Sequence, residues 1–253
     1  MCYDINFESG IEFITDYLPD IVLLPGIDYN FFAQAHVQAQ AFLPHPVVIM
    51  ENDKPTLKLF EWGVIASYMN TPEKVKKSRA WMCNARADKI PDITSYWYKI
   101  RNQRCLIPVS GIYEHRRVEG FKTKIPYHVS VKNEKMVFLP GLYNYSPIAN
   151  PDTGEFVGTY TMVTRNANSV MKQIHNADPD DPRMPLFLPF ELAKKWLYEV
   201  NDEAIEEVVS FEMPSEKLDY YPVYTIRGGK PRPDDKKKNE PFEWGNLPEV
   251  VVE

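Results

Sequence analysis

The chain has few of the features that mark secreted, membrane-spanning or disordered proteins. Its 253 residues contain only three cysteines, an odd number without paired spacing, so we expect free thiols in a reducing cytoplasm rather than a disulfide framework. Apolar runs such as residues 21–24 and 47–50 are far shorter than the ~18 residues that a transmembrane helix needs. Residues 1–20 include five acidic residues and no Lys or Arg, a composition unlike that of a secretory signal. These deficits predict a cytoplasmic protein with no membrane segment.

Apolar and charged residues are both plentiful. Hydrophobic residues make up 44% of the chain and aromatic residues 13%, which excludes a disordered protein and suffices for a packed core. Residues 71–140 carry a net charge of +9, whereas residues 1–70 carry −7 and residues 141–253 carry −8. A basic middle segment in an acidic protein is either a binding site for a polyanion or a solvated basic face.

The distribution of short apolar segments predicts an α+β domain with antiparallel strands, because strand-like and helix-like segments do not alternate regularly. We expect one domain over residues 1–227, followed by an extended or mobile tail over residues 228–253 that is rich in Pro, Gly and charge and whose end Phe242 and Trp244 could fix. The predicted strands are Pro46–Met50, Leu57–Trp62, Gln103–Val109, Pro126–Val131, Met136–Leu139 and Gly158–Val163; the predicted helices are Gly10–Tyr17, Asn30–Ala41, Thr71–Lys77, Ile93–Asn102, Ser169–His175 and Glu191–Val200.

Cys2 is the first residue that could carry chemistry. Removal of Met1 would leave a free α-amine and a thiol on adjacent carbons, and an α-amine titrates near ~8, so an appreciable fraction is neutral at neutral pH. Such a 1,2-aminothiol condenses with an aldehyde: the amine forms an imine, and the thiol then closes a five-membered thiazolidine ring. The alternative is that a cysteine at this position has no function.

Two short segments in the basic middle could add to this chemistry. Asn84 can orient a reacting group through its amide, and Arg86 can bind a phosphate through its guanidinium fork. Glu114 follows Gly111 after an apolar strand, so its carboxylate could face a cleft, where burial would raise its pKa and suit it to proton transfer. The alternatives are a turn followed by a surface arginine, and an exposed turn acid.

His175 closes a predicted helix, and Arg183 follows it eight residues later. A histidine at a helix end is either a proton shuttle or a satisfied core residue. The other histidines show no metal-ligand spacing, and Cys83 and Cys105 lie 22 residues apart without a CxxC motif. We therefore expect neither a metal ion nor another cofactor.

Several of these motifs occur in one order along the chain: Met1-Cys2, Trp62-Gly63, Asn84-Ala85-Arg86-Ala87, Gly111-x-Tyr113-Glu114, Thr164-x-x-Ala167-Asn168, Ile174-His175 and Arg183-Met184-Pro185. In this order they resemble the SOS-response-associated peptidase family, from Cys2 to about Val223. The resemblance implies a single α+β domain around a twisted, antiparallel, barrel-like β core flanked by short helices. It also implies that the protein recognises abasic sites in single-stranded DNA and cross-links to them through the N-terminal cysteine as a thiazolidine, which shields the lesion during the DNA damage response.

The resemblance implies a role for each catalytic candidate. Cys2 would be the nucleophile, both for cross-linking and for removal of Met1, and a lyase activity could accompany the cross-link. Asn84 would position the α-amine and the sugar. Glu114 would be the acid/base in imine formation and in opening of the deoxyribose, and His175 would lie beside the sugar hydroxyl.

The resemblance also implies a set of DNA contacts. Arg86 and Arg183 match phosphate-binding arginines, and Thr164 lies near the histidine at the sugar. Pro44 and Trp62 resemble an apolar wedge that keeps a duplex from continuing past the lesion. The expected partner is single-stranded DNA containing abasic sites, bound by a monomer that associates with the nucleoid.

The sequence departs from the family pattern at four places. Tyr3-Asp4 replaces a common Gly-Arg, His115 replaces a tryptophan, Trp62-Gly63 is followed by Val-Ile-Ala without a frequent proline, and residues 176–182 form an acidic insertion. These changes favour retained chemistry with altered DNA affinity and strand preference. Two other interpretations stay open: a cysteine peptidase with external substrates, in which Cys2 attacks a carbonyl, and a module that binds single-stranded DNA without a covalent step.

Overall fold

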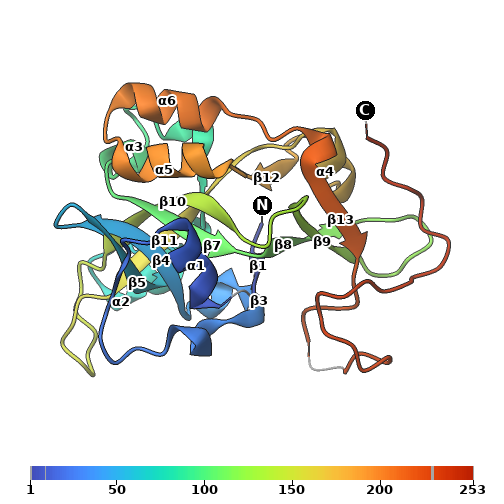
Figure 1. Ribbon diagram of the computed structural model, residues 1–253, viewed down its shortest axis with the longest axis horizontal. Helices are drawn as coiled ribbons and strands as arrows, with labels where there is room; N and C mark the ends of the chain where they lie inside the picture. Colours follow the sequence, from blue (N-terminus) through green and yellow to red (C-terminus); the bar gives the residue numbers. More distant parts are fainter. Residues whose placement is uncertain (1, 9, 229–230, 253) are drawn as a thin grey trace.

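The computed structural model describes residues 2–8, 10–228 and 231–252. Helices and strands are mixed along the chain, as an α+β fold requires (Figure 1). In chain order the elements are β1 (Asp4–Phe7), α1 (Ile11–Tyr17), β2 (Val22–Leu23), β3 (Gln34–Gln38), β4 (Pro44–Glu51), β5 (Lys54–Trp62), α2 (Pro72–Ser78), β6 (Asn84–Arg86), α3 (Tyr96–Lys99), β7 (Arg104–Val109), β8 (Gly111–Arg116), β9 (Ile125–Val131), β10 (Val137–Tyr145), β11 (Gly158–Asn166), α4 (Ser169–Ile174), β12 (Arg183–Pro185), α5 (Phe190–Tyr198), α6 (Asp202–Ser210) and β13 (Leu218–Pro222).

A closed ring of five strands forms the main core. The strands pair in the order β5, β4, β7, β10 and β11, and β11 pairs back onto β5, which closes the ring. The hairpin between β4 and β5 turns on Asn52 and Asp53, whose φ values of 52° and 61° are those of a two-residue turn matched to the twist of the strands. The barrel-like α+β core is therefore confirmed, with parallel pairs at β11–β5, β11–β6 and β2–β5 among antiparallel ones.

A second sheet packs beside the ring in the order β13, β9, β8, β1 and β3. The chain passes into it from the ring through Ser110 alone, because β7 ends at Val109 and β8 begins at Gly111. A side chain at Gly111 would place its Cβ 2.5 Å from Nε2 of His128, so only glycine fits at this crossing. The alternative of an exposed turn acid is therefore wrong: Glu114 lies inside a strand of the second sheet and is buried.

The helices cover the two sheets from outside. Helix α5 packs on β10, β7 and β4 and against α6, as Figure 1 shows at the upper left. Local sequence sets several helix starts: the Thr71 hydroxyl accepts from the Lys74 N–H ahead of Pro72 in α2, and the Asn168 side chain accepts from the Met171 N–H in α4.

The six predicted strands are all present, and so are the predicted helices that became α1, α2, α4 and α5. The predicted helix Asn30–Ala41 is wrong, because residues 34–38 form β3 and pair with β1. Ile93–Asn102 contains only the single turn of α3.

The tail runs along the second sheet. Over residues 231–252 it contains neither a helix nor a strand, apart from one isolated bridge between Pro241 and Val223. The Trp244 indole N–H donates to the Val223 carbonyl at 2.8 Å, and the Trp244 ring stacks on Tyr224.

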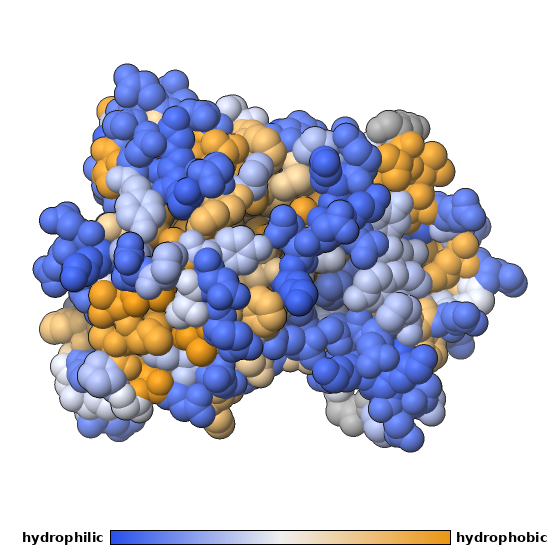
Figure 2. Space-filling model, viewed as in Figure 1, coloured by the Kyte–Doolittle hydropathy of each residue, from blue (hydrophilic) through white to orange (hydrophobic). Residues whose placement is uncertain are grey.

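On the face in Figure 2, hydrophilic residues cover most of the surface and hydrophobic residues gather on the left, over the ring. No helix within the described residues is long and apolar enough to cross a bilayer.

Candidate active site

Cys2 lies where the two sheets meet. It lies two residues before the first residue of β1, which pairs with β8 so that Asp4 stands opposite Tyr113. Cys2 is only 1% exposed, and its thiol lies 3.5 Å from the Asp4 carbonyl oxygen and 3.9 Å from that of Tyr113. Burial, with a smaller effect from the nearby Glu114 carboxylate, raises the pKa of the thiol well above its ordinary value. The sulfur is therefore a neutral thiol at neutral pH.

Glu114 follows Tyr113 on β8 and is 6% exposed. Its Oε1 accepts a hydrogen bond from the His115 backbone N–H at 2.9 Å, whereas Oε2 is buried with no partner among the described residues. Burial is the main cause that raises the pKa of this carboxyl from its ordinary 4.5 to about 7. Near neutral pH the group therefore exists in both its acid and its base form, as a proton-transfer residue must.

Asn84 holds the start of the chain in place. It begins β6, which lies parallel to β11 with Asn84 opposite Met162. Its Nδ2 donates to the Cys2 carbonyl oxygen at 3.0 Å. Its Oδ1 is a buried acceptor to which no described donor bonds. One amide thus fixes the Cys2 backbone and keeps a second polar atom beside it.

His175 ends α4 and is buried. Its Nδ1 accepts a hydrogen bond from the Arg183 backbone N–H at 3.1 Å, so the neutral imidazole carries its proton on Nε2. Burial lowers the pKa of His175 to about 4, which keeps the ring neutral at physiological pH. His175 is therefore a hydrogen-bond donor rather than a cation.

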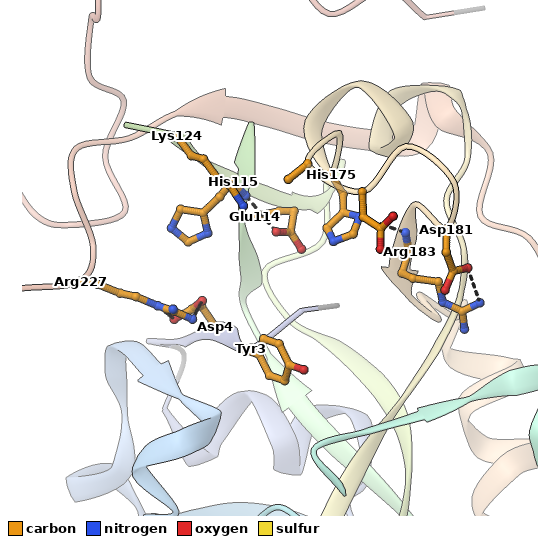
Figure 3. Close-up of a pocket in the computed structure, with 11 residues that line it drawn as sticks. Tyr3, Asp4, Glu114, His115, Lys124, His175, Asp181, Arg183 and Arg227 are labelled. Carbon is orange, nitrogen blue, oxygen red and sulfur yellow. Dashed lines mark hydrogen bonds and ion pairs between the residues drawn. The ribbon is translucent and has the colours of Figure 1, made fainter. Parts of the chain in front are cut away.

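Glu114 and His175 line one pocket of about 580 Å³, shown in Figure 3. In this view the two side chains occupy the middle of the pocket, with Arg227 and Lys124 on one side and Arg183 and Asp181 on the other. The remaining lining residues are Tyr3, Asp4, His115, Ala177 and Asp178. Among the residues that the structure describes, no group of His, Cys, Asp or Glu side chains is arranged to hold a metal ion.

The two predicted phosphate-binding arginines share an acidic partner. Arg183 is buried, and its guanidinium donates to the Thr164 carbonyl at 3.0 Å and to the Asn166 side chain at 2.8 Å. Arg86 is 44% exposed and donates to Asp181 at 3.1 Å; Arg183 also lies 3.7 Å from Asp181. The acidic insertion thus places one carboxylate between both arginines. The predicted residue Thr164 belongs to this end of the site, since its hydroxyl is 3.4 Å from Arg183.

Pro44 and Trp62 do not lie at this pocket. Trp62 is 1% exposed, donates its indole N–H to the Cys83 carbonyl at 2.8 Å and stacks on Tyr160, so it is a core residue without a surface for a DNA base. Its prediction as a wedge is therefore wrong for this structure. Pro44 is exposed at the start of β4 and lines a separate cavity of about 150 Å³.

Two pocket residues, Arg227 and Lys124, were missed from the sequence, and so was His36, which contacts the pocket residue Asp4. Arg227 and His36 both bond to the buried Asp4 carboxylate, at 2.5 Å and 2.7 Å, and Lys124 lies on the loop between β8 and β9. Only Asp4 could have pointed to them: an acid in a buried strand needs cationic partners. The sequence does not say which cations these are, because they lie 32 and 223 residues away.

The chain is similar to known proteins over most of its length. The pattern described as "SOS response associated peptidase (SRAP)" matches residues 27–226, a range that includes Asn84, Glu114 and His175. Abasic site processing protein YoqW of Bacillus subtilis is 30% identical over 158 residues, 62% of this chain and 63% of that protein. Abasic site processing protein HMCES of Xenopus tropicalis is 25% identical over 218 residues, 78% of this chain and 61% of that protein. The chain thus spans a little under two thirds of the length of these relatives.

Solved structures share the fold. A crystal structure of a protein from Bacteroides thetaiotaomicron matches with a TM-score of 0.75 at 28% identity, over 95% of this chain and 97% of that chain. A Bordetella bronchiseptica protein matches with a TM-score of 0.71 at 18% identity, over 88% of this chain and 100% of that chain. Both contain the same arrangement of sheets and helices.

Proposed function

The chain belongs to the SOS response associated peptidase family, and from this premise we propose that it processes abasic sites in single-stranded DNA by cross-linking to them through Cys2. The observation that carries the proposal is the arrangement around Cys2: Asn84 holds its carbonyl, and the Glu114 carboxyl, with a pKa of about 7, lies next to it in a polar pocket. The relatives named as abasic site processing proteins support the same lesion as substrate.

In the first step of the proposed reaction the chain removes its own Met1, and the Cys2 thiol is the nucleophile. The neutral α-amine of Cys2 then attacks the C1′ aldehyde of the ring-opened deoxyribose, and a C–N bond forms. Loss of one water gives an imine. The thiol sulfur adds to the imine carbon while the thiol proton passes to nitrogen, which closes the thiazolidine. Because the buried thiol is neutral, the amine is the first nucleophile for the aldehyde.

Glu114 and His175 have separate parts in this reaction. Opening the sugar and expelling water both require a proton to be delivered and later recovered, and the Oε2 atom of Glu114 is the buried oxygen available for it. His175 donates from Nε2 to a sugar oxygen, because its Nδ1 is occupied by the Arg183 backbone. The buried Oδ1 of Asn84 would accept from the Cys2 amine. A lyase activity would follow if the imine intermediate loses the 3′ phosphate.

An external peptidase fits the site less well. Such an enzyme needs a readily formed thiolate at every turnover, whereas burial raises the pKa of Cys2; removal of Met1 happens once per chain and tolerates a slow nucleophile. His175 is a neutral donor rather than a base paired with the thiol. Peptide cleavage therefore remains an outcome of the test below.

Denaturing electrophoresis tests the proposal. Purified protein is mixed with an oligonucleotide that carries one aldehyde-bearing abasic site, and intact mass first establishes whether Met1 has been removed. We expect a heat-stable covalent band with the wild type and none with Cys2→Ala. Cys2→Ser from which intact mass shows Met1 to be absent should give a band only after borohydride reduction, because it keeps the amine and loses the thiol. A Cys2→Ala band as strong and stable as that of the wild type would contradict the proposal, as would turnover of peptides without any DNA adduct.

A further inference from the structure

We propose that Arg227 and Lys124 form a phosphate-binding subsite on the side of the pocket opposite to Arg183, and that it binds a backbone phosphate next to the abasic sugar. The inference rests on the proposed function for its ligand, a DNA strand. Of its two residues, Lys124 lies within the matched range 27–226 and Arg227 lies one residue beyond it.

Arg227 is held in position with one edge of its guanidinium unused. Its Nε donates to Oδ1 of Asp4 at 3.0 Å, and its Nη2 donates to Oδ2 at 2.5 Å. Asp4 is buried and is held in turn by His36 at 2.7 Å, so the carboxylate cannot turn away. No described residue accepts a hydrogen bond from Nη1. Since Arg227 is 43% exposed and lines the pocket, its second N–H fork is available to an anion that enters there.

Lys124 supplies the net positive charge that the arginine alone lacks. The charge of Arg227 is compensated by Asp4, whereas no carboxylate of the described chain lies within ion-pair distance of Lys124. Lys124 is exposed at the end of the loop before β9 and lines the same pocket as Arg227. Figure 3 places both cations on one side of Glu114, while Arg183 with its partner Asp181 lies on the other.

This arrangement fits the geometry that an abasic nucleotide requires. Its sugar has one phosphate on each side, so a pocket that holds the sugar at Glu114 and His175 needs an anion site at both ends. Arg86 and Arg183 provide one end. Asp4 holds Arg227, which lies 223 residues further along the chain, at the second end.

The test measures binding without the covalent step. Fluorescence anisotropy follows a single-stranded oligonucleotide that carries a tetrahydrofuran abasic analogue, which has no aldehyde, over a series of salt concentrations. Lys124→Ala and Arg227→Gln should each weaken binding about fivefold and flatten the slope of log K against log salt by about 0.7, the contribution of one phosphate contact to a single strand. Lys122→Ala is the matched control: it removes the same charge from the same loop at an exposed position that does not line the pocket.

A modified oligonucleotide localises the contact. When the two phosphates that flank the lesion are replaced by neutral methylphosphonates, Arg227→Gln and Lys124→Ala should bind as the wild type does. Equal losses on modified and unmodified DNA, or binding by both variants equal to that of Lys122→Ala, would overturn the subsite. If the wild type still cross-links an aldehyde-bearing abasic strand, only the subsite is wrong. If the wild type neither cross-links nor binds, the proposed function fails and the subsite fails with it.

Discussion

Glu114 combines two properties that rarely occur in one residue of a stable core: it is buried, and one of its oxygens has no partner in the described chain. Its pKa is raised from 4.5 to about 7, so the folded protein holds a proton that the unfolded chain releases between these values. Stability from this group is therefore present below pH 4.5 and is lost as pH rises to 7.

Glu114→Gln removes this titration. The glutamine keeps the acceptor for the His115 N–H. Between pH 4 and pH 8, the free energy of unfolding of the wild type should fall by about 3 kcal/mol more than that of the variant, since one pKa unit corresponds to ~1.4 kcal/mol. Urea denaturation at both pH values measures this difference. The same variant should form the DNA adduct about 10²-fold more slowly, because the proton donor is lost.

Glu119→Gln is the matched control, since it makes the same substitution at an exposed position five residues later. It should change neither the pH profile of stability nor the adduct rate. If Glu114→Gln and wild type show parallel stability profiles, the carboxyl is not held protonated in the fold. Retained adduct rate would remove Glu114 from the mechanism even if the stability profile changes.

At the scale of elements, the acidic segment between α4 and β12 is the clearest departure from a simple DNA-binding pocket. Its Asp181 pairs with Arg86 at 3.1 Å and lies 3.7 Å from Arg183, the position that a phosphate would need. In the proposed function, DNA would have to displace this carboxylate before both arginines could bind the backbone, and the segment would then tune affinity.

Asp181→Asn should strengthen binding of the tetrahydrofuran oligonucleotide about fivefold, because Arg183 loses its competing carboxylate and Arg86 keeps only its pair with Asp88. The salt slope should steepen by about 0.7, as one more contact releases a counterion. Anisotropy at several salt concentrations measures both effects. Asp180→Asn, which changes the neighbouring exposed acid, should leave them unchanged. Equal affinities of Asp181→Asn and wild type would show that the ion pairs do not compete with DNA.

The elements that sequence patterns could predict are those whose signal is local. Six strands are short apolar segments between turn residues: β4, β5, β7, β9, β10 and β11. Thr71 and Asn168 are the residues that cap the N-termini of α2 and α4. Residues 30–41 were predicted as a helix and contain four alanines; in the fold, pairing with β1 outweighs their helix propensity. Strand β8 was missed because Gly111 is typical of turns, whereas here His128 requires a glycine at this point of a strand.

The site divides in the same way. Cys2, Asn84, Glu114 and His175 could be proposed because their motifs lie in a known order, and the fold brings Asn84 and Glu114 to Cys2. The Asp4–Arg227 pair could not be proposed, because no local pattern connects residues 223 positions apart. Trp62 was placed at the DNA by its motif, but a residue's motif does not say whether its side chain points into the core.

For the whole molecule, buried histidines make the fold sensitive to acid. His45 is 1% and His128 5% exposed, and burial lowers the pKa of each from 6.5 to about 4. Both ring nitrogens of His128 are without a hydrogen-bond partner in the described structure, and the ring stacks on Tyr221 at 5.2 Å. A protonated His128 would be an uncompensated buried charge, which is a severe penalty in a protein interior.

The direction of the pH dependence follows from these pKa values. Between pH 6.5 and 4, His45 and His128 are protonated in the unfolded chain but stay neutral in the folded protein. The contribution of each to the free energy of unfolding therefore falls by up to about 3 kcal/mol as the pH drops through this range. Glu114 acts in the opposite direction over pH 4.5–7, with a similar magnitude. Burial also lowers the pKa of His175 to about 4, so three histidines oppose one carboxyl, and the molecule as a whole should lose stability on acidification.

His128→Phe separates the two opposing effects. Phenylalanine keeps an aromatic ring beside Tyr221 and cannot take up a proton, so the loss of unfolding free energy between pH 7.5 and pH 4.5 should shrink by about 2 kcal/mol relative to wild type. Glu114→Gln should enlarge the same loss, because it removes the group that opposes the histidines. Urea denaturation of the three proteins at both pH values measures the two shifts. Since every variant is compared with itself at two pH values, the cost of fitting a phenylalanine near Gly111 cancels. Shifts of the same sign in the two variants would mean that buried titration does not govern the acid stability of this fold.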